Sequence, residues 1–448
     1  MTDIKDDYVE DIFNMYGKTD REEEIKSEED SLKELENAYN VNPLEIREKY
    51  ISSLEKLEDL YEENDQIPNA INQRVKIVQI FEDLYNENPL EMRDKYISRL
   101  DYLELMYVRN GQISNAIIQR TKILQIFEDL YNNDQASWIK KYSMNLYKIS
   151  ALYKNNDQIE DAIKFGEHAI AVIKPSYKIN QKKFIDYYEI FLKNIAWVYS
   201  ETDIQKAIQY KKEHVSVCKF LYENELLFLE TDYPVSIVGL ATLFKKIKQK
   251  EKAIELEKAA LNISEIICKK DPMLTRVNYH ERLEEFAEYY LEINMGKEAI
   301  ALLEKRLEEE NKYSDVIGSY SPILEKLGSY SLKIEDFQLS KKYFKEYFKT
   351  INLYKIDSIE YFVLPFVKYY QSVLQLNEDV KELEVFATKC IDILKKQFDT
   401  TSDIPFDETF DYKINDLKEK YFEYKNSKDS IKRQKYKIFE KIFMNKDY

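Results

Sequence analysis

The chain has 448 residues, 44% hydrophobic and 33% charged, but only 7 glycines and 9 prolines. Because sheets need glycine for turns and bulges while helices exclude it, this composition predicts an all-α protein with a sizeable core. The formal net charge of −16 argues against nucleic-acid binding, which requires a basic face.

Cellular location is suggested by what the sequence lacks. No apolar run approaches the roughly 18 residues that a membrane helix needs, and the start MTDIKDDYVED is acidic, unlike a signal peptide. The three cysteines, Cys218, Cys268 and Cys390, are odd in number and far apart, as expected for small packing residues in a reducing compartment. We therefore expect a cytoplasmic protein without a transmembrane segment.

The first segment, residues 1–40, carries 14 acidic and 5 basic residues. Its second half aligns with the second helix of the repeats described below. We expect an acidic capping helix pair here, since terminal repeats need a polar outer face.

Internal repetition dominates residues 41–395. VKIVQIFEDLYNENP at 75–89 returns 46 residues later as TKILQIFEDLYNNDQ at 121–135, and NPLEIREKYIS at 42–52 returns as NPLEMRDKYIS at 88–98. Each copy has an apolar-periodic helix, a turn of about four residues and a second helix. One such pair cannot bury both faces, so the sequence predicts stacked tandem pairs.

This pattern resembles the tetratricopeptide family, in which apolar positions at fixed offsets precede a tyrosine and, nine residues on, an alanine. The matching positions are Tyr61 and Ala70, Tyr107 and Ala116, Tyr153 and Ala162, Tyr199 and Ala207, Phe244 and Ala253, Tyr290 and Ala299, with degenerate seventh and eighth copies at Gly328 and Ser340 and at Val373 and Leu383. The resemblance implies an all-α superhelix, a tetratricopeptide-like solenoid of about eight helix pairs.

Three departures from the family pattern affect the expected packing. The period of 46 exceeds the family's usual length of about 34, as in kinesin light chains. The fourth turn lacks one residue. Glu58 and Glu104 replace the small residue of the first helix, which predicts looser packing in the first two repeats.

After Phe398 the stretch DTTSDIPFDETFD breaks the periodicity, and residues 411–448 carry 7 acidic and 11 basic residues. We expect basic C-terminal capping helices within 396–448. The segment SIKRQKYKIFEKIFMNK also allows contact with a membrane surface or RNA, although capping explains it equally well.

A search for chemistry finds little. The sequence contains no phosphate-binding glycine loop, HExxH, CxxC or nucleophile elbow. His168 and His214 are 46 residues apart and could form a metal site with Glu167 and Glu213, but ordinary surface histidines are the favoured interpretation. We predict no catalytic residue, metal or cofactor, and a chain that is not an enzyme.

The resemblance implies a concave groove lined by exposed first-helix positions. Carried over to this sequence, the groove residues are Tyr147, Lys154, Lys193, Trp197, Lys245, Lys246, Glu284 and Glu288. Trp197 carries the most weight, because its offset points it away from the packing stripe. The alternative is that these residues belong to ordinary solvated helix faces.

Together these features predict a non-enzymatic scaffold that binds a protein or extended peptide in its groove, such as the sensor or adaptor part of a multi-protein system. The alternative is a structural homo-oligomer in which acidic N-terminal and basic C-terminal caps dock head to tail.

Overall fold

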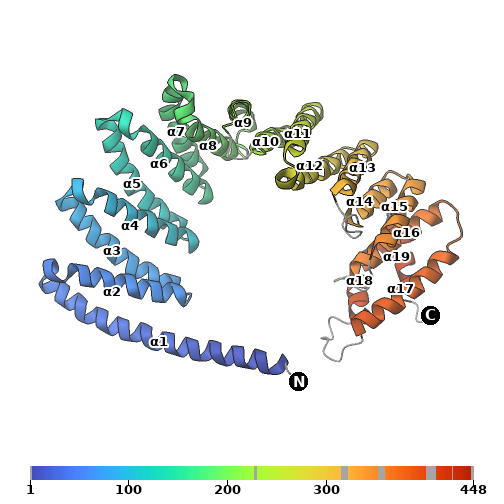
Figure 1. Ribbon diagram of the computed structural model, residues 1–448, viewed down its shortest axis with the longest axis horizontal. Helices are drawn as coiled ribbons and strands as arrows, with labels where there is room; N and C mark the ends of the chain where they lie inside the picture. The colour runs from blue at the N-terminus through green and yellow to red at the C-terminus, as the bar shows by residue number, and fades with distance from the viewer. Residues whose placement is uncertain are drawn as a thin grey trace. The chain divides into compact units, whose positions relative to one another are not determined.

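The computed structural model describes residues 3–226, 230–313, 321–351, 359–399, 410–425 and 427–444, and within these residues all regular structure is helical (Figure 1). The chain divides into two units. The N-terminal unit comprises residues 1–228 and 242–248, and the C-terminal unit comprises residues 229–241 and 249–448.

The N-terminal unit consists of nine described helices and the end of a tenth. They are α1 (Asp3–Val41), α2 (Pro43–Glu63), α3 (Ile67–Glu87), α4 (Pro89–Arg109), α5 (Ile113–Asn133), α6 (Gln135–Asn155), α7 (Ile159–Ile179), α8 (Gln181–Tyr199), α9 (Ile204–Glu223) and the last residues of α10 (Asp232–Lys246). Each helix from α1 to α8 packs on the next one along the chain.

The C-terminal unit begins with the first part of α10. Its further helices are α11 (Lys250–Lys270), α12 (Pro272–Glu292), α13 (Gly296–Tyr313), α14 (Ser321–Lys333), α15 (Phe337–Thr350), α16 (Glu360–Gln375), α17 (Lys381–Asp399), α18 (Phe410–Lys425) and α19 (Ser430–Phe439), followed by a π-helical turn, Glu440–Met444. Along the described residues, eight helix pairs follow one another from α2/α3 to α16/α17. We number these pairs as repeats 1 to 8. The predicted all-α solenoid of about eight pairs is confirmed.

The N-terminal cap differs from the expected helix pair. α1 is a single helix of 39 residues. The stretch contains one glycine and no proline, so it has no strong signal to end a helix and begin another. The side chains of residues 1–20, which carry part of the predicted acidic cap, lie outside the described residues.

A left-handed residue marks the turn within most helix pairs. It recurs, with a positive φ of 56–71°, at Asp65, Gly111, Asp157, Lys248, Asn294, Glu335 and Asn377. In repeat 1 the Gln66 N–H donates to the Tyr61 carbonyl oxygen (2.8 Å), whereas in repeat 4 the Asp203 N–H donates to the Tyr199 oxygen (2.9 Å). Repeat 4 therefore closes its turn one residue earlier, and its shorter turn has no positive-φ residue in the described chain.

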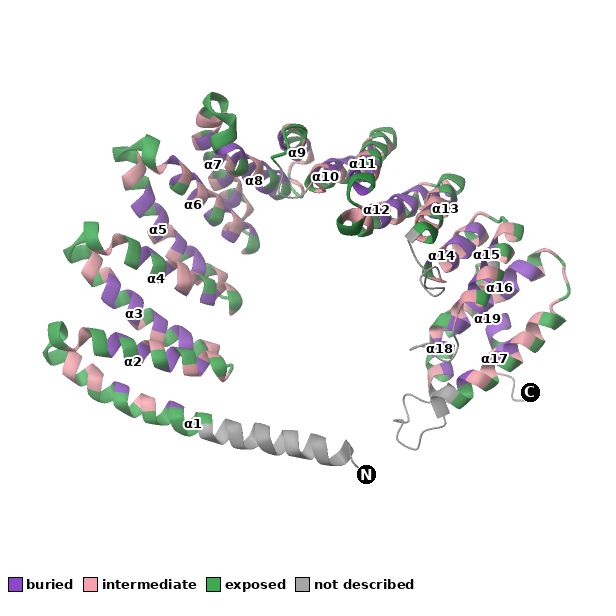
Figure 2. Cartoon of the chain, viewed as in Figure 1, coloured by how far each residue is buried: buried purple, intermediate pink, exposed green. Residues whose placement is uncertain are grey.

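The alanine nine residues after each tyrosine sits at a close helix crossing. Ala70, Ala116 and Ala162 are fully buried, as are the equivalents Ala207, Ala253 and Ala299. Figure 2 shows buried residues where helices face one another, with exposed residues at the helix ends. A larger side chain at these positions would separate the two helices of a pair.

The repeated phrase IFEDLYN builds the contact between successive pairs. Ile80 and Phe81 are buried, and Tyr85 stacks on Tyr96 of the next first helix at 5.2 Å between ring centroids. Glu82 accepts a hydrogen bond from Lys122 of the next second helix (2.7 Å). The same stacking recurs between Tyr39 and Tyr50, Tyr131 and Tyr142, and Tyr177 and Tyr188. The phrase is thus a stacking surface.

The expectation of looser packing at Glu58 and Glu104 is wrong. Glu58 is completely buried, and the Arg74 guanidinium donates to its Oε1 from Nε (2.9 Å) and Nη2 (2.7 Å). Glu104 is paired likewise with Arg120, whose Nε lies 2.6 Å from Oε2. Sixteen residues separate each glutamate from its arginine, so a long cation on the second helix fills the space that the glutamate opens.

The residue pair at this crossing changes along the chain while the crossing remains filled. The positions of Glu58 and Arg74 are taken by Ser150 and Gly166 in repeat 3, by Ala287 and Leu303 in repeat 6, and by Gly328 and Phe344 in repeat 7. A Cβ on Gly328 would lie 2.9 Å from Phe344, so the large ring requires the glycine. Complementary volume and charge, rather than residue type, are kept at this crossing.

Candidate functional site

The exposed surface around Trp197 lies on α8, in the N-terminal unit. Most of this helix is buried, and Lys193 and Trp197, four residues apart, share its exposed face. Trp197 is 46% exposed. The tryptophan therefore points away from the packing stripe, the position that the groove prediction requires.

Three elements bring polar groups to Trp197. Lys154 of α6 lies with Nζ 5.3 Å from the centre of the Trp197 ring and 3.0 Å from Oε2 of Glu201. Lys246 of α10 donates to the carbonyl oxygen of Ser200 at 3.5 Å. The hydrogen bond from Lys154 lowers the pKa of the Glu201 carboxyl. We call Lys154, Lys193, Trp197, Glu201 and Lys246 the Trp197 patch.

Two predicted groove residues contribute less to this surface. Tyr147 is half-buried, and its ring stacks on Phe191 of α8 at 5.5 Å between centroids. Burial raises the pKa of its hydroxyl. Lys245 is also partly buried. Tyr147 thus packs between two first helices, α6 and α8.

Glu284 and Glu288 belong to α12, in the C-terminal unit. Nζ of Lys326, on α14, lies 2.5 Å from Oε2 of Glu284 and 3.3 Å from Oε1 of Glu288. Nε of Arg306 lies 3.4 Å from Glu284. These carboxylates are largely neutralised within their own unit, so an incoming ligand finds little free negative charge there.

The interpretation of His168 and His214 as ordinary surface histidines is wrong for His214. His168 is exposed and meets Tyr142 edge-on. His214 is 3% exposed and His280 is 4% exposed. A constant spacing of 46 residues could not place His214, because the one-residue deletion in the fourth turn shifts it onto the packed face of α9.

His214 lies in a polar cluster that sequence reasoning missed. Its Nε2 is 2.5 Å from Oε1 of Glu189, on α8, and 3.7 Å from Sγ of Cys218, one turn further along α9. Neither Glu167 nor Glu213 joins it, because Glu213 pairs with Lys174. The internal repeats could have revealed this cluster, because the first two repeats hold apolar residues at the positions that align with Glu189, His214 and Cys218.

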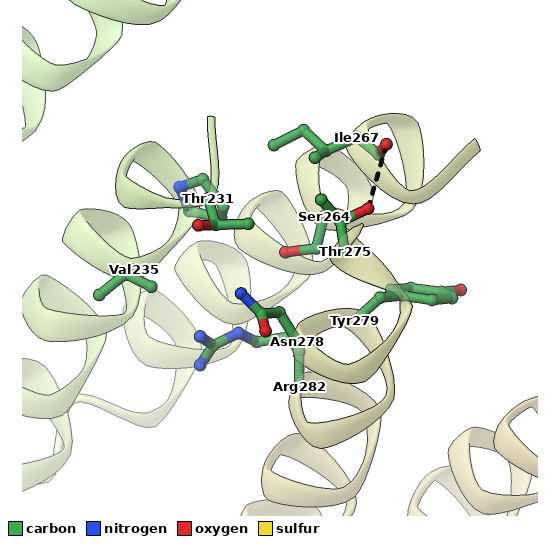
Figure 3. A pocket seen from close by; sticks show the side chains of 9 residues that line it. Thr231, Val235, Ser264, Ile267, Thr275, Asn278, Tyr279 and Arg282 are labelled. Atoms are coloured by element: carbon green, nitrogen blue, oxygen red, sulfur yellow. Dashed lines mark hydrogen bonds between the residues drawn. The ribbon is translucent and has the colours of Figure 1, made fainter. Parts of the chain in front are cut away.

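Two of the hollows in the described part of the C-terminal unit are lined by polar side chains as well as apolar ones. The smaller, of about 10 Å³, is shown in Figure 3 between α11, α12 and the start of α10, where Thr275 bonds the Ile267 carbonyl oxygen. Nε of Arg282 beside it has no hydrogen-bond partner among the described residues. This volume holds about one water molecule.

The larger hollow, of about 250 Å³, lies between α16, α18 and α19. It is lined by Glu360, Leu364, Lys368, Leu417, Tyr421, Tyr424 and Lys435. Burial lowers the pKa of the Lys435 ammonium, and the Lys368 charge lowers it further. The hollow is below the size of about 300–1,000 Å³ typical of ligand pockets. Within the described residues, no helix is both long and apolar enough to cross a membrane.

No protein-family model matches the chain, and no curated protein matches its sequence. Among solved structures, BtubC from P. vanneervenii is 15% identical, with a TM-score of 0.36, over 55% of this chain and 92% of that one. A kinesin-light-chain-like protein from Podospora anserina has nearly identical tetratricopeptide-like repeats. It is 17% identical to this chain, with a TM-score of 0.36, over 49% of this chain and 96% of that one.

A third similar structure is a signal transduction ATPase with numerous domains and a tetratricopeptide repeat sensor, from Pyrococcus horikoshii. It is 12% identical, with a TM-score of 0.42, over 79% of this chain and 57% of that one. The second and third of these structures carry tetratricopeptide or tetratricopeptide-like repeats. The helix pairs themselves define the fold here, and similarities at this level say nothing of a ligand.

Proposed function

We propose that this chain is a non-enzymatic scaffold that binds an extended protein segment on the Trp197 patch of its N-terminal unit. The observation that carries the proposal is the exposure of Trp197 on an otherwise packed helix, with a lysine ammonium over its ring. A large aromatic side chain in water gives up the free energy that burial would provide. A partner that covers it recovers that energy.

The charges of the patch indicate the chemistry of the partner. Lys154 is paired with Glu201. Lys193 is exposed one turn before Trp197 on α8, and Lys246 is exposed on α10. An apolar side chain placed against Trp197, with a carboxylate on either side of it, would meet one ring and two ammonium groups. The favoured ligand is an extended segment with an apolar residue flanked by acidic ones.

The test begins with selection of binders from a random peptide library displayed against the whole chain. Trp197→Ala should weaken the selected peptides by about 30-fold or more, the effect of losing an aromatic anchor worth about 2 kcal/mol. Lys193→Glu should weaken them more at low salt than at high salt. Helicity should stay unchanged, because neither side chain belongs to the core.

Ile118→Ala is the matched control, since Ile118 is 53% exposed on α5, a second helix outside the patch. It should leave peptide affinity unchanged. Peptides that bind the Trp197→Ala chain as tightly as the wild type would refute the proposed site. Selection of peptides without acidic residues would refute the proposed ligand chemistry while leaving the scaffold role intact.

A further inference from the structure

Three core positions of repeat 4 have changed together from apolar to metal-binding residue types. Glu189, His214 and Cys218 align with Ile51, Ile77 and Phe81 of repeat 1. The offset is three periods of 46 residues for Glu189, and it is one residue shorter for His214 and Cys218 because the fourth turn lacks a residue. In repeat 2 the same positions hold Ile97, Ile123 and Phe127. All six of these apolar residues are buried. The internal repeats thus show that the crossing packs well without polar groups.

The three side chains converge on one point. The Glu189 oxygen, the His214 nitrogen and the Cys218 sulfur all lie within 4.8 Å of one another. Nε2 of His214 faces both of the other atoms, at 2.5 Å from the carboxylate and 3.7 Å from the sulfur. His214 and Cys218 are 3% and 1% exposed, whereas the Glu189 side chain is 21% exposed. One edge of the cluster is therefore open to water.

Repeat 6 provides an internal comparison. The same three positions hold His280, Arg306 and Glu310. There Nη1 of Arg306 lies 2.7 Å from the Glu310 carboxylate, which in turn lies 3.4 Å from Nδ1 of His280. In repeat 6 the chain thus supplies its own cation to a histidine and a carboxylate. In repeat 4 the position of Arg306 is taken by His214 and that of Glu310 by Cys218, so this cluster has no cation of its own.

We propose that Glu189, His214 and Cys218 form a binding site for a divalent transition-metal ion of the zinc type. An imidazole nitrogen, a thiolate and a carboxylate are the three ligand types that zinc takes from proteins, and three of them leave a fourth position for water. Nε2 of the neutral imidazole gives up its hydrogen bond to the carboxylate, and its proton moves to Nδ1, so that the neutral ring binds the ion through Nε2. The ion displaces the thiol proton of Cys218 to solvent, so that the sulfur binds as thiolate.

The geometry requires only a small adjustment. Metal–nitrogen and metal–oxygen bonds of about 2.0–2.2 Å in a tetrahedron place the two ligand atoms about 3.3 Å apart. The present 2.5 Å must therefore widen, while the 3.7 Å to sulfur is already suitable. Glu189 is the most exposed of the three side chains and can make the movement.

Two lysines oppose the ion. Lys211, on α9, is largely buried, and burial lowers the pKa of its ammonium. Lys193, on α8, adds positive charge nearby. Because the ion brings two positive charges and removes one proton, the cluster becomes more positive on binding by one charge. Removing the Lys211 charge should therefore tighten metal binding.

The experiment uses the untagged full-length chain with Co²⁺ and Zn²⁺. One equivalent of Co²⁺ should give a thiolate-to-cobalt charge-transfer band, and one Zn²⁺ per chain should abolish it and raise the Tm. Cys218→Ser should remove the band, and His214→Gln should weaken binding at least tenfold, as expected for loss of a ligand. Lys211→Met should tighten binding several-fold.

Cys268→Ser is the control, because Cys268 is equally buried but lies on α11 in the C-terminal unit. It should retain the band. Absence of a band in the wild type, or a band that survives Cys218→Ser, overturns the proposal. If Cys218→Ser fails to fold by circular dichroism, the decision rests on Glu189→Gln, because Glu189 is the most exposed of the three ligands and tolerates substitution best. Unchanged affinity in that variant also overturns the proposal.

Discussion

Replacing Arg74 by leucine while leaving Glu58 in place should destabilise the N-terminal repeats by about 3–5 kcal/mol. The carboxylate is completely buried, its Oε1 receives both hydrogen bonds from Arg74, and its Oε2 has no hydrogen-bond partner among the described residues. Without the guanidinium, the buried carboxyl group must either hold an uncompensated charge or take up a proton, and in both cases it loses its two hydrogen bonds from Arg74. The lost packing of Arg74 over the Tyr102 ring adds to the cost.

The double variant Glu58→Ala and Arg74→Leu should lie within about 1 kcal/mol of the wild type, or be more stable. Buried ion pairs often cost as much to desolvate as their attraction returns. Repeat 6 already has alanine and leucine at these positions, as Ala287 and Leu303, both fully buried. The double-mutant cycle should therefore give a coupling energy of at least about 2 kcal/mol.

Urea unfolding gives the overall stability, and amide hydrogen exchange in α2 and α3 gives the local one, since repeat arrays can open one pair at a time. A double variant as unstable as Arg74→Leu alone would refute the reasoning. That result would mean that the volume of the arginine, and not the charge left behind, determines the cost.

The difference in stability between the double variant and the wild type should depend on pH. Burial raises the pKa of Glu58 to about 7, outweighing the opposite effect of Arg74. A carboxyl group with a raised folded-state pKa contributes stability that is complete below the unfolded pKa of about 4.5 and is lost as the pH rises through about 7. The double variant lacks this loss, so its advantage over the wild type should grow between about pH 5 and 8. An advantage that shrinks would show that the pair lowers the pKa of Glu58.

Three further outcomes are expected. Ala116→Leu should cost about 1–3 kcal/mol by overpacking a fully buried crossing, and an unchanged Tm would show that the crossing is loose. Lys435→Met should raise the Tm by removing a desolvated ammonium that has no hydrogen-bond or ion-pair partner among the described residues, whereas a lower Tm would mean that the charge is compensated. If segments 1–40 and 411–448 dock head to tail, the apparent mass in light scattering should fall as salt rises from about 50 to 500 mM, and a salt-independent monomer would rule out that assembly.

The sequence alone determined the helix pairs, their number and their turns. These features follow from local periodicity and turn residues, and a repeated sequence forms the same local structure in each copy. Ala116 could be assigned to a helix crossing because its spacing from Tyr107 recurs. The exposed position of Trp197 followed from the same offsets.

The tertiary structure alone decided which charged side chains find partners. Glu58 suggested a loosely packed crossing, but it is filled by Arg74 from the next helix. Glu288 suggested a ligand-facing acid, but Lys326 of the following repeat neutralises much of its charge. His214 lies in the core because the one-residue deletion in the fourth turn changes which face of α9 it occupies. Periodicity fixes the face of a helix that a residue occupies. The partner across the gap depends on the crossing of two helices and on the reach of long side chains, neither of which is encoded locally.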